Sequence, residues 1–136
     1  MNTAAKWFRI VVWIGILANW GFALGVYTMP RALLEFLKLG EVNTTIWLFN
    51  YSVLLTLLSC FYIPAAADPT RYIVNAWLLV ACRLIPATTF FVGSAIGFMP
   101  RGFITLGVGD STFGIIEAIL LIRLLSWERE HRPPGQ

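Results

Sequence analysis

The sequence predicts an all-α integral membrane protein built as a four-helix bundle, and three observations support this fold class. The 136-residue chain is strongly apolar, with 58% hydrophobic residues and a mean hydropathy of +0.74. Only 12% of its residues are charged, whereas a soluble domain usually carries about a quarter. Apolar stretches recur that are as long as the ~20 helical residues needed to cross a ~30 Å hydrocarbon core.

Short polar connections separate the predicted spans, which cover about residues 7–26, 44–63, 72–96 and 103–126. Each span must satisfy its own backbone hydrogen bonds in lipid, and none shows the two-residue alternation of a barrel strand, so helices are expected. The short connections favour an up-down-up-down arrangement in a single domain, residues 1–136. The polar tail, residues 127–136, is expected to be solvated.

A short amphipathic helix is predicted after the first span, at about residues 30–39. Pro30 suits the first turn of a helix and Gly40 suits its end. Four apolar side chains fall near one face: Leu33, Leu34, Phe36 and Leu37. The pattern predicts a helix lying at the membrane interface, with an ordered loop as the alternative.

Two further motifs concern the third span. Asp68 and Pro69 are expected to start it, as N-cap and first helical residue. Pro86 lies inside the same span. It predicts a kink, which is compatible with a cavity.

The distribution of Lys and Arg predicts the orientation. With the N-terminus inside, six basic residues fall on the inner side and three on the outer side. The inner set is Lys6, Arg9, Arg71, Arg123, Arg129 and Arg132, and the outer set is Arg31, Lys38 and Arg101. Because basic residues accumulate on the cytoplasmic side, both termini are expected in the cytoplasm.

Three charged residues fall well inside the predicted spans, away from the span ends: Arg83 in the third, and Asp110 and Glu117 in the fourth. A charge at the bilayer centre costs about 2.5–3.5 kcal/mol on insertion scales, so such residues face protein or water and find a partner. At ~1.5 Å per residue, Arg83 lies between the two carboxylates in depth, and the seven-residue spacing places both carboxylates on one helix face. We therefore expect an Asp110–Arg83–Glu117 cluster.

This cluster has three interpretations. It is a buried network that fixes helix packing, a site for a polar headgroup, a quinone or a proton, or a set of separate contacts with partner subunits. One amide in each of the first three spans adds candidate secondary polar contacts: Asn19, Asn50 and Asn75. Intramembrane amides contribute ~0.6 kcal/mol on average when they link helices, and contact with a ligand is the alternative.

Cysteine and histidine usage limits the redox and metal chemistry. Cys60 and Cys82 lie in apolar stretches and lack CxxC spacing, which favours free thiols over a redox pair. The single histidine, His131, lies in the polar tail, so no histidine is available inside the bilayer to hold a haem. No metal or cofactor is expected, and no basic run indicates nucleic-acid binding.

The chain combines three features: KWFRIVVWIGILANWGFALG in the first span, the amphipathic link, and GDSTFGIIEAILLIRLL in the last span. In its architecture this combination resembles the DoxX-like group of small bacterial four-helix membrane proteins. The resemblance covers most of the chain and implies a bacterial inner (cytoplasmic) membrane. Members are often accessory or membrane subunits of oxidoreductase systems, and no catalytic residues carry over.

Three functional hypotheses follow. The first is an accessory or anchor subunit of a larger membrane complex, such as an electron-transfer system, with protein partners or a second copy of the chain. The second is a binder or carrier of a lipid, quinone or isoprenoid, with Arg83, Asp110 and Glu117 lining a pocket. The third is a membrane enzyme that uses Glu117 or Asp110 as acid or base. An elongated pocket reaching Arg83 would favour the second or third hypothesis.

Overall fold

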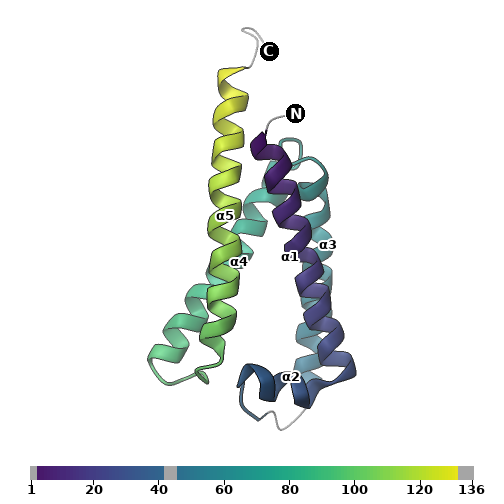
Figure 1. The fold of residues 1–136 in the computed structure, drawn as a ribbon, viewed down its shortest axis with the longest axis vertical. Helices are drawn as coiled ribbons and strands as arrows, with labels where there is room; N and C mark the ends of the chain where they lie inside the picture. The colour runs from purple at the N-terminus through teal and green to yellow at the C-terminus, as the bar shows by residue number, and fades with distance from the viewer. Residues whose placement is uncertain (1–2, 42–45, 132–136) are drawn as a thin grey trace.

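A computed structural model describes residues 3–41 and 46–131 of the chain. Within these residues the protein is all-α, as predicted, with one short helix after the first long one. The helices are α1 (Thr3–Thr28), α2 (Pro30–Leu37), α3 (Ile46–Ala67), α4 (Ile73–Ala95) and α5 (Phe103–Glu130). The long helices alternate in direction and pack as a bundle, with the start of α1 and the end of α5 at the same end (Figure 1).

The helices overlap the predicted spans but differ from them at some ends. The last helix continues to Glu130, so residues 127–130 of the predicted polar tail are helical. Glutamate and arginine are good helix formers, and they extend α5 beyond the end of the apolar run. The predicted start of the second span at Thr44 and the end of the tail, residues 132–136, lie outside the described residues.

The start of α4 also differs from the prediction. Asp68 and Pro69 precede the helix by a full turn, and α4 begins at Ile73 after Tyr72. The Asp68–Pro69 pair therefore does not cap α4 and instead forms a separate turn between α3 and α4. Pro86 lies within α4, which continues through it to Ala95.

The side chain of Asp68 stabilises this turn. Its Oδ1 accepts hydrogen bonds from the Arg71 backbone N–H at 3.1 Å and the Thr70 hydroxyl at 2.9 Å. Both bonds favour the ionised carboxylate, and the bond from Arg71, the larger effect, holds the pKa of Asp68 below its ordinary value.

The amphipathic helix α2 is shorter than predicted. It ends at Leu37 because Lys38 adopts a left-handed conformation, with φ of 54°. Leu33, Leu34 and Leu37 are half-buried, but Phe36 is 82% exposed and points away from the bundle.

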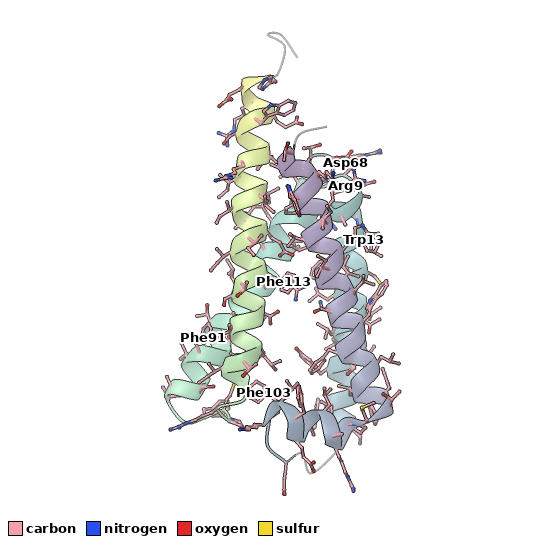
Figure 2. All side chains as sticks on the ribbon, viewed as in Figure 1. Arg9, Trp13, Asp68, Phe91, Phe103 and Phe113 are labelled. Carbon is pink, nitrogen blue, oxygen red and sulfur yellow. The ribbon has the colours of Figure 1, made fainter. Side chains whose placement is uncertain are left out.

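Within the described residues, three helices are long and apolar enough to cross a membrane: α1, α3 and α4. The mean hydropathy of an 18-residue window in each is 1.8, 1.7 and 1.6, respectively. The outer surface of the bundle carries many large apolar side chains (Figure 2). In water such a continuous apolar surface would be unfavourable, whereas lipid accommodates it. The fourth long helix, α5, is not among the three and carries Asp110, Glu117 and Arg123.

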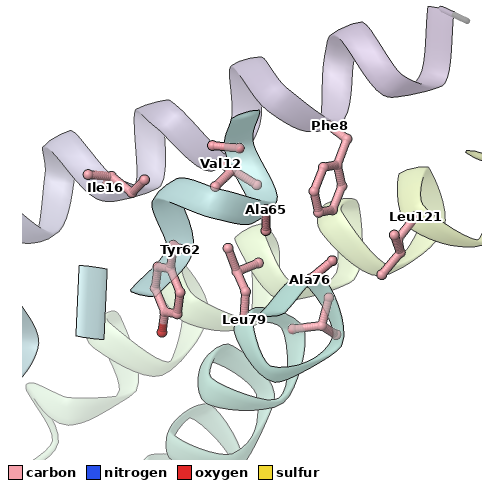
Figure 3. Close-up of a cluster of buried hydrophobic side chains, with 10 residues drawn as sticks. Phe8, Val12, Ile16, Tyr62, Ala65, Ala76, Leu79 and Leu121 are labelled. Atoms are coloured by element: carbon pink, nitrogen blue, oxygen red, sulfur yellow. The ribbon is translucent and has the colours of Figure 1, made fainter. Parts of the chain in front are cut away.

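A tightly packed core occupies the end of the bundle where α1 begins. All four long helices contribute to it (Figure 3). Its buried members are Phe8, Val12, Ile16, Tyr62, Ala65, Ala66, Ala76, Leu79, Val80 and Leu121. The small alanines let the backbones of α3 and α4 approach closely at this end.

Toward the other end, the α1/α3 pair and the α4/α5 pair diverge, and α2 lies across the wide end (Figure 1). The α4/α5 and α1/α3 contacts are the most extensive in the bundle, and among the four pairs of neighbouring long helices the α3/α4 contact is the sparsest. The turn before α5 closes against the end of α2, where a side chain at Gly102 would collide with the backbone of Leu37 and Lys38. The bundle therefore has a packed half and an open half.

Candidate functional site

Arg83 lies at the junction between the two halves. It projects from α4 and is only 6% exposed. Its Nη1 donates hydrogen bonds to Asp110 Oδ1 on α5 at 3.0 Å and to Asn19 Oδ1 on α1 at 3.1 Å. The bond to Asp110 is a salt bridge in which the Asp110 side chain keeps 25% exposure. Charge-assisted bonds of this type are roughly twice as strong as neutral ones.

Asn19 extends the network to the remaining long helix. While its carbonyl oxygen accepts from Arg83, its Nδ2 donates to Ser59 Oγ on α3 at 3.0 Å. The Ser59 hydroxyl in turn donates to the Leu55 carbonyl at 2.8 Å. A single polar chain, Ser59–Asn19–Arg83–Asp110, therefore connects α3, α1, α4 and α5.

Aromatic rings cover the Arg83 guanidinium. Its Cζ lies 5.3 Å from the centroid of the Phe113 ring and 5.9 Å from that of Tyr62. Figure 2 shows Phe113 between α5 and α1. A cation over a ring face in a desolvated site is attracted by up to about 2 kcal/mol, so these rings offset part of the cost of burying the charge.

A glycine provides the space for this arginine. Gly15 on α1 is buried, and a Cβ added there would lie 2.5 Å from Arg83 Nη2. The same Cβ would lie 3.7 Å from Oε1 of Glu117. Gly15 thus lets α1 pass close to both side chains.

Glu117 is adjacent to this network but not bonded to it. The side chain is fully buried on α5. Neither of its carboxyl oxygens has a hydrogen-bond partner among the described residues, and Arg83 Nε also lacks one there. No nitrogen of Arg83 lies within ion-pair distance of Glu117 in the part of the chain that the structure describes. Of the expected Asp110–Arg83–Glu117 cluster, the structure joins Arg83 to Asp110 and leaves Glu117 beside them.

The other two asparagines lie away from Arg83. Asn75 donates from Nδ2 to the Phe61 carbonyl at 3.1 Å, a link between α4 and α3 near their connecting turn. Asn50 is exposed on α3, and its side chain makes no hydrogen bond to any described residue. Only Asn19 of the three amides joins the predicted cluster.

The polar network opens onto cavities in the open half of the bundle. One of about 200 Å³ and another of about 560 Å³ are both lined by Asn19, Arg83 and Asp110. A third, of about 240 Å³, lies toward α2 and is lined by Leu34 and Leu39. Tyr51 and Phe90 line all three, so the cavities share walls and extend from α2 to Arg83.

Several residues of this site were missed at the sequence level: Tyr51, Ser59, Tyr62 and Phe113. Ser59 and Tyr51 are polar side chains within the second predicted span, and this polarity is the signal that would have indicated them. The rings of Tyr62 and Phe113 gave no such signal, because aromatic residues are common in membrane proteins.

The cysteines are free, with Cys60 exposed on α3 and Cys82 half-buried at the wall of the 560 Å³ cavity. Among the described residues, no group of three or more His, Cys, Asp or Glu side chains is placed to hold a metal ion.

Comparison of this chain with protein-family models, with curated proteins and with solved structures finds no match. The resemblance to the DoxX-like group therefore stays a prediction from the sequence.

Proposed function

We propose that this chain is an integral membrane protein that crosses the bilayer four times and binds a small lipid-soluble molecule between its helix pairs. The polar head of that molecule would lie at the Arg83–Asp110 pair, and its apolar part would fill the cavities. Both termini would lie in the cytoplasm, as the basic residues predict.

The orientation of side chains on α5 supports a fourth crossing. Asp110 and Glu117 face the interior of the bundle, whereas Ile115, Ile119 and Ile122 are about half exposed on the outside. The helix has 28 residues, more than the ~20 needed for a span. Its inward charges are therefore compatible with a lipid-facing outer surface.

The observation that carries the binding proposal is the partial exposure of Asp110 at the inner end of apolar cavities. Ligand sites are largely apolar hollows with a few convergent polar groups that fix orientation. Arg83 is buried and bonded, while a quarter of the Asp110 side chain faces the cavity. The cavity walls are otherwise mainly leucine and aromatic side chains.

This arrangement favours the binder over the other two hypotheses. An accessory subunit needs no internal cavity that reaches a buried ion pair. An acid–base enzyme needs a carboxyl group within hydrogen-bond reach of its substrate. Glu117 lines none of these three cavities among the described residues, and Asp110 is already bonded to Arg83.

A cavity-filling variant tests the proposal. Gly109 lines the 200 Å³ cavity, and a Cβ added there meets no atom within 4 Å. Gly109→Leu should therefore fill the space without disturbing the helices. Gly21→Leu is the matched control, because Gly21 also has open space around it but lies on the outer surface of α1 and lines no cavity.

The measurement is mass spectrometry of the lipid-soluble molecules that co-purify in mild detergent. We expect a specific molecule with the wild type and with Gly21→Leu, and at least a tenfold reduction, about 1.4 kcal/mol, with Gly109→Leu. Equal retention by both variants, with both folded, would place any bound molecule outside these cavities and refute the proposal. The same conclusion would follow if only bulk lipid co-purified with the wild type.

A further inference from the structure

The geometry points to a ligand with a neutral hydroxyl head on an apolar chain, such as an isoprenoid alcohol, which enters sideways from the bilayer between α3 and α4. This inference rests on the proposed function and adds the chemical class of the ligand and its route.

The charge of the cavity walls selects a neutral head. Across the three connected cavities, Arg83 and Asp110 are the charged residues among the described lining, and they neutralise each other. A phosphate or an ammonium head would bring an uncompensated charge into this interior, which costs several kcal/mol per ion. A neutral polar head avoids that cost.

The hydrogen-bonding groups of the site favour a head group that can donate a hydrogen bond. Asp110 accepts from Arg83 through Oδ1, and no described residue donates to its second carboxylate oxygen. A hydroxyl head can donate to this free oxygen, whereas a ketone or ester cannot. Tyr51 lines the same cavities and makes no side-chain hydrogen bond within the described structure, so its hydroxyl is available to donate in turn.

The 560 Å³ cavity reaches the outer surface of the bundle between α3 and α4. Leu54 on α3 and Ile85 on α4 both line it, yet they are 64% and 66% exposed. Among the four pairs of neighbouring long helices around the bundle, this pair also has the sparsest contact. Because its rim is apolar, the opening faces the hydrocarbon and suits a chain that stays in lipid while its head moves inward.

The head group is tested with three probes that share one chain: farnesol, farnesylamine and farnesyl phosphate. Each is titrated against purified protein in lipid nanodiscs, with binding read from the shift in thermal unfolding. Farnesol should bind the wild type at least about tenfold more tightly than either charged probe. Tighter binding of farnesyl phosphate or farnesylamine by the wild type would overturn the assignment.

The variant Asp110→Asn tests the same assignment, because it should reverse the preference for the neutral head group. Removal of this carboxylate leaves Arg83 without its ion-pair partner, so the preference should move toward farnesyl phosphate by about tenfold or more. An unchanged preference in folded Asp110→Asn would mean that the head does not lie at this pair. If no farnesyl probe binds while another molecule co-purifies and is displaced by Gly109→Leu, this inference fails and the proposed function stands.

The route is tested with the native Cys82, which lies at the wall of the 560 Å³ cavity. In a Cys60→Ser background Cys82 is the single thiol of the chain. We expect a lipid-soluble maleimide to label it in liposomes, and Leu54→Trp to slow the labelling by about tenfold because the indole covers the opening. Leu57→Trp is the matched control, since Leu57 is similarly exposed on α3 but does not line the cavity.

Equal labelling rates in Leu54→Trp and Leu57→Trp would overturn the lateral route. So would faster labelling by a water-soluble, membrane-impermeant maleimide, because the thiol would then be reached from the aqueous side.

Discussion

Gly15→Ala should destabilise the bundle by displacing a side chain rather than a backbone. The added Cβ would lie 2.5 Å from Arg83 Nη2, about 1 Å closer than ordinary van der Waals contact. A free arginine would move aside at little cost. Here the guanidinium is held by Asn19 and Asp110 through Nη1 and lies against the Phe113 ring, so the displacement must weaken these contacts.

The magnitude follows from what is lost and gained. Hydrogen bonds between membrane helices contribute ~0.6 kcal/mol on average and up to ~1.7 kcal/mol, so weakening two of them costs about 1–3 kcal/mol. Replacing glycine by alanine inside a helix stabilises by up to about 1 kcal/mol. The net expectation for Gly15→Ala is a loss of about 0–2 kcal/mol.

Gly21→Ala on the same helix is the control, because a Cβ there meets nothing within 4 Å. Gly21→Ala should keep the stabilisation that comes from replacing glycine by alanine in a helix, and it should weaken no contact. The free energy of unfolding of both variants is measured by denaturation in mixed micelles, followed by circular dichroism, and Gly15→Ala should be the less stable by about 1–3 kcal/mol. Equal stability of the two variants would refute the claim that Gly15 is required for the position of Arg83.

Three further predictions concern the same polar groups and the α3–α4 turn. Arg83→Leu should lower the yield of folded protein because it leaves Asp110 unpaired, and the double variant Arg83→Leu/Asp110→Leu should recover part of that yield; no recovery would contradict the pairing. A double-mutant cycle with Asn19→Ala and Ser59→Ala should give a coupling energy of ~0.6 kcal/mol, and zero coupling would contradict their hydrogen bond. Because the pKa of Asp68 is lower in the folded state, its carboxylate stabilises the folded protein at pH values above the pKa of the unfolded chain, near 3.8. This contribution is lost as the pH falls through the lower pKa of the folded state. Asp68→Asn should therefore show less acid-dependent loss of stability in that window, measured by unfolding as a function of pH, and a profile identical to that of the wild type would contradict the turn hydrogen bonds.

The sequence predicted the helices well because their signals are local. Long apolar runs and the scarcity of charge define the long helices, and Pro30 marks the start of α2. The errors lie where neighbouring segments compete. Asp68 resembles an N-cap in the sequence, but the following residues form a turn first. Lys38 rather than Gly40 ends α2, because Lys38 already adopts the left-handed conformation.

The candidate site was only partly predictable, because depth along a helix does not give rotation about its axis. The depth estimate predicted Arg83 at a level between Asp110 and Glu117, but it gave no means of choosing between the two carboxylates. The structure pairs Arg83 with Asp110, and Glu117 lies close to Gly15 without a hydrogen bond to any described residue. The diverging helix pairs, and hence the cavities, result from packing between distant residues, which a single span does not reveal.

The opening between α3 and α4 reflects where small residues allow neighbouring helices to approach closely. Gly114 on α5 is so close to α4 that a Cβ there would lie 2.8 Å from Leu84 and 2.9 Å from the Cβ of Arg83. The α3/α4 pair has such small residues at the packed end, where Ala65 and Ala76 are fully buried. Further along, Tyr51 and Phe90 line the space instead. Bulky rings hold the backbones apart, so the two helices separate next to Arg83, where a polar head could be bonded and an apolar chain could leave for the bilayer.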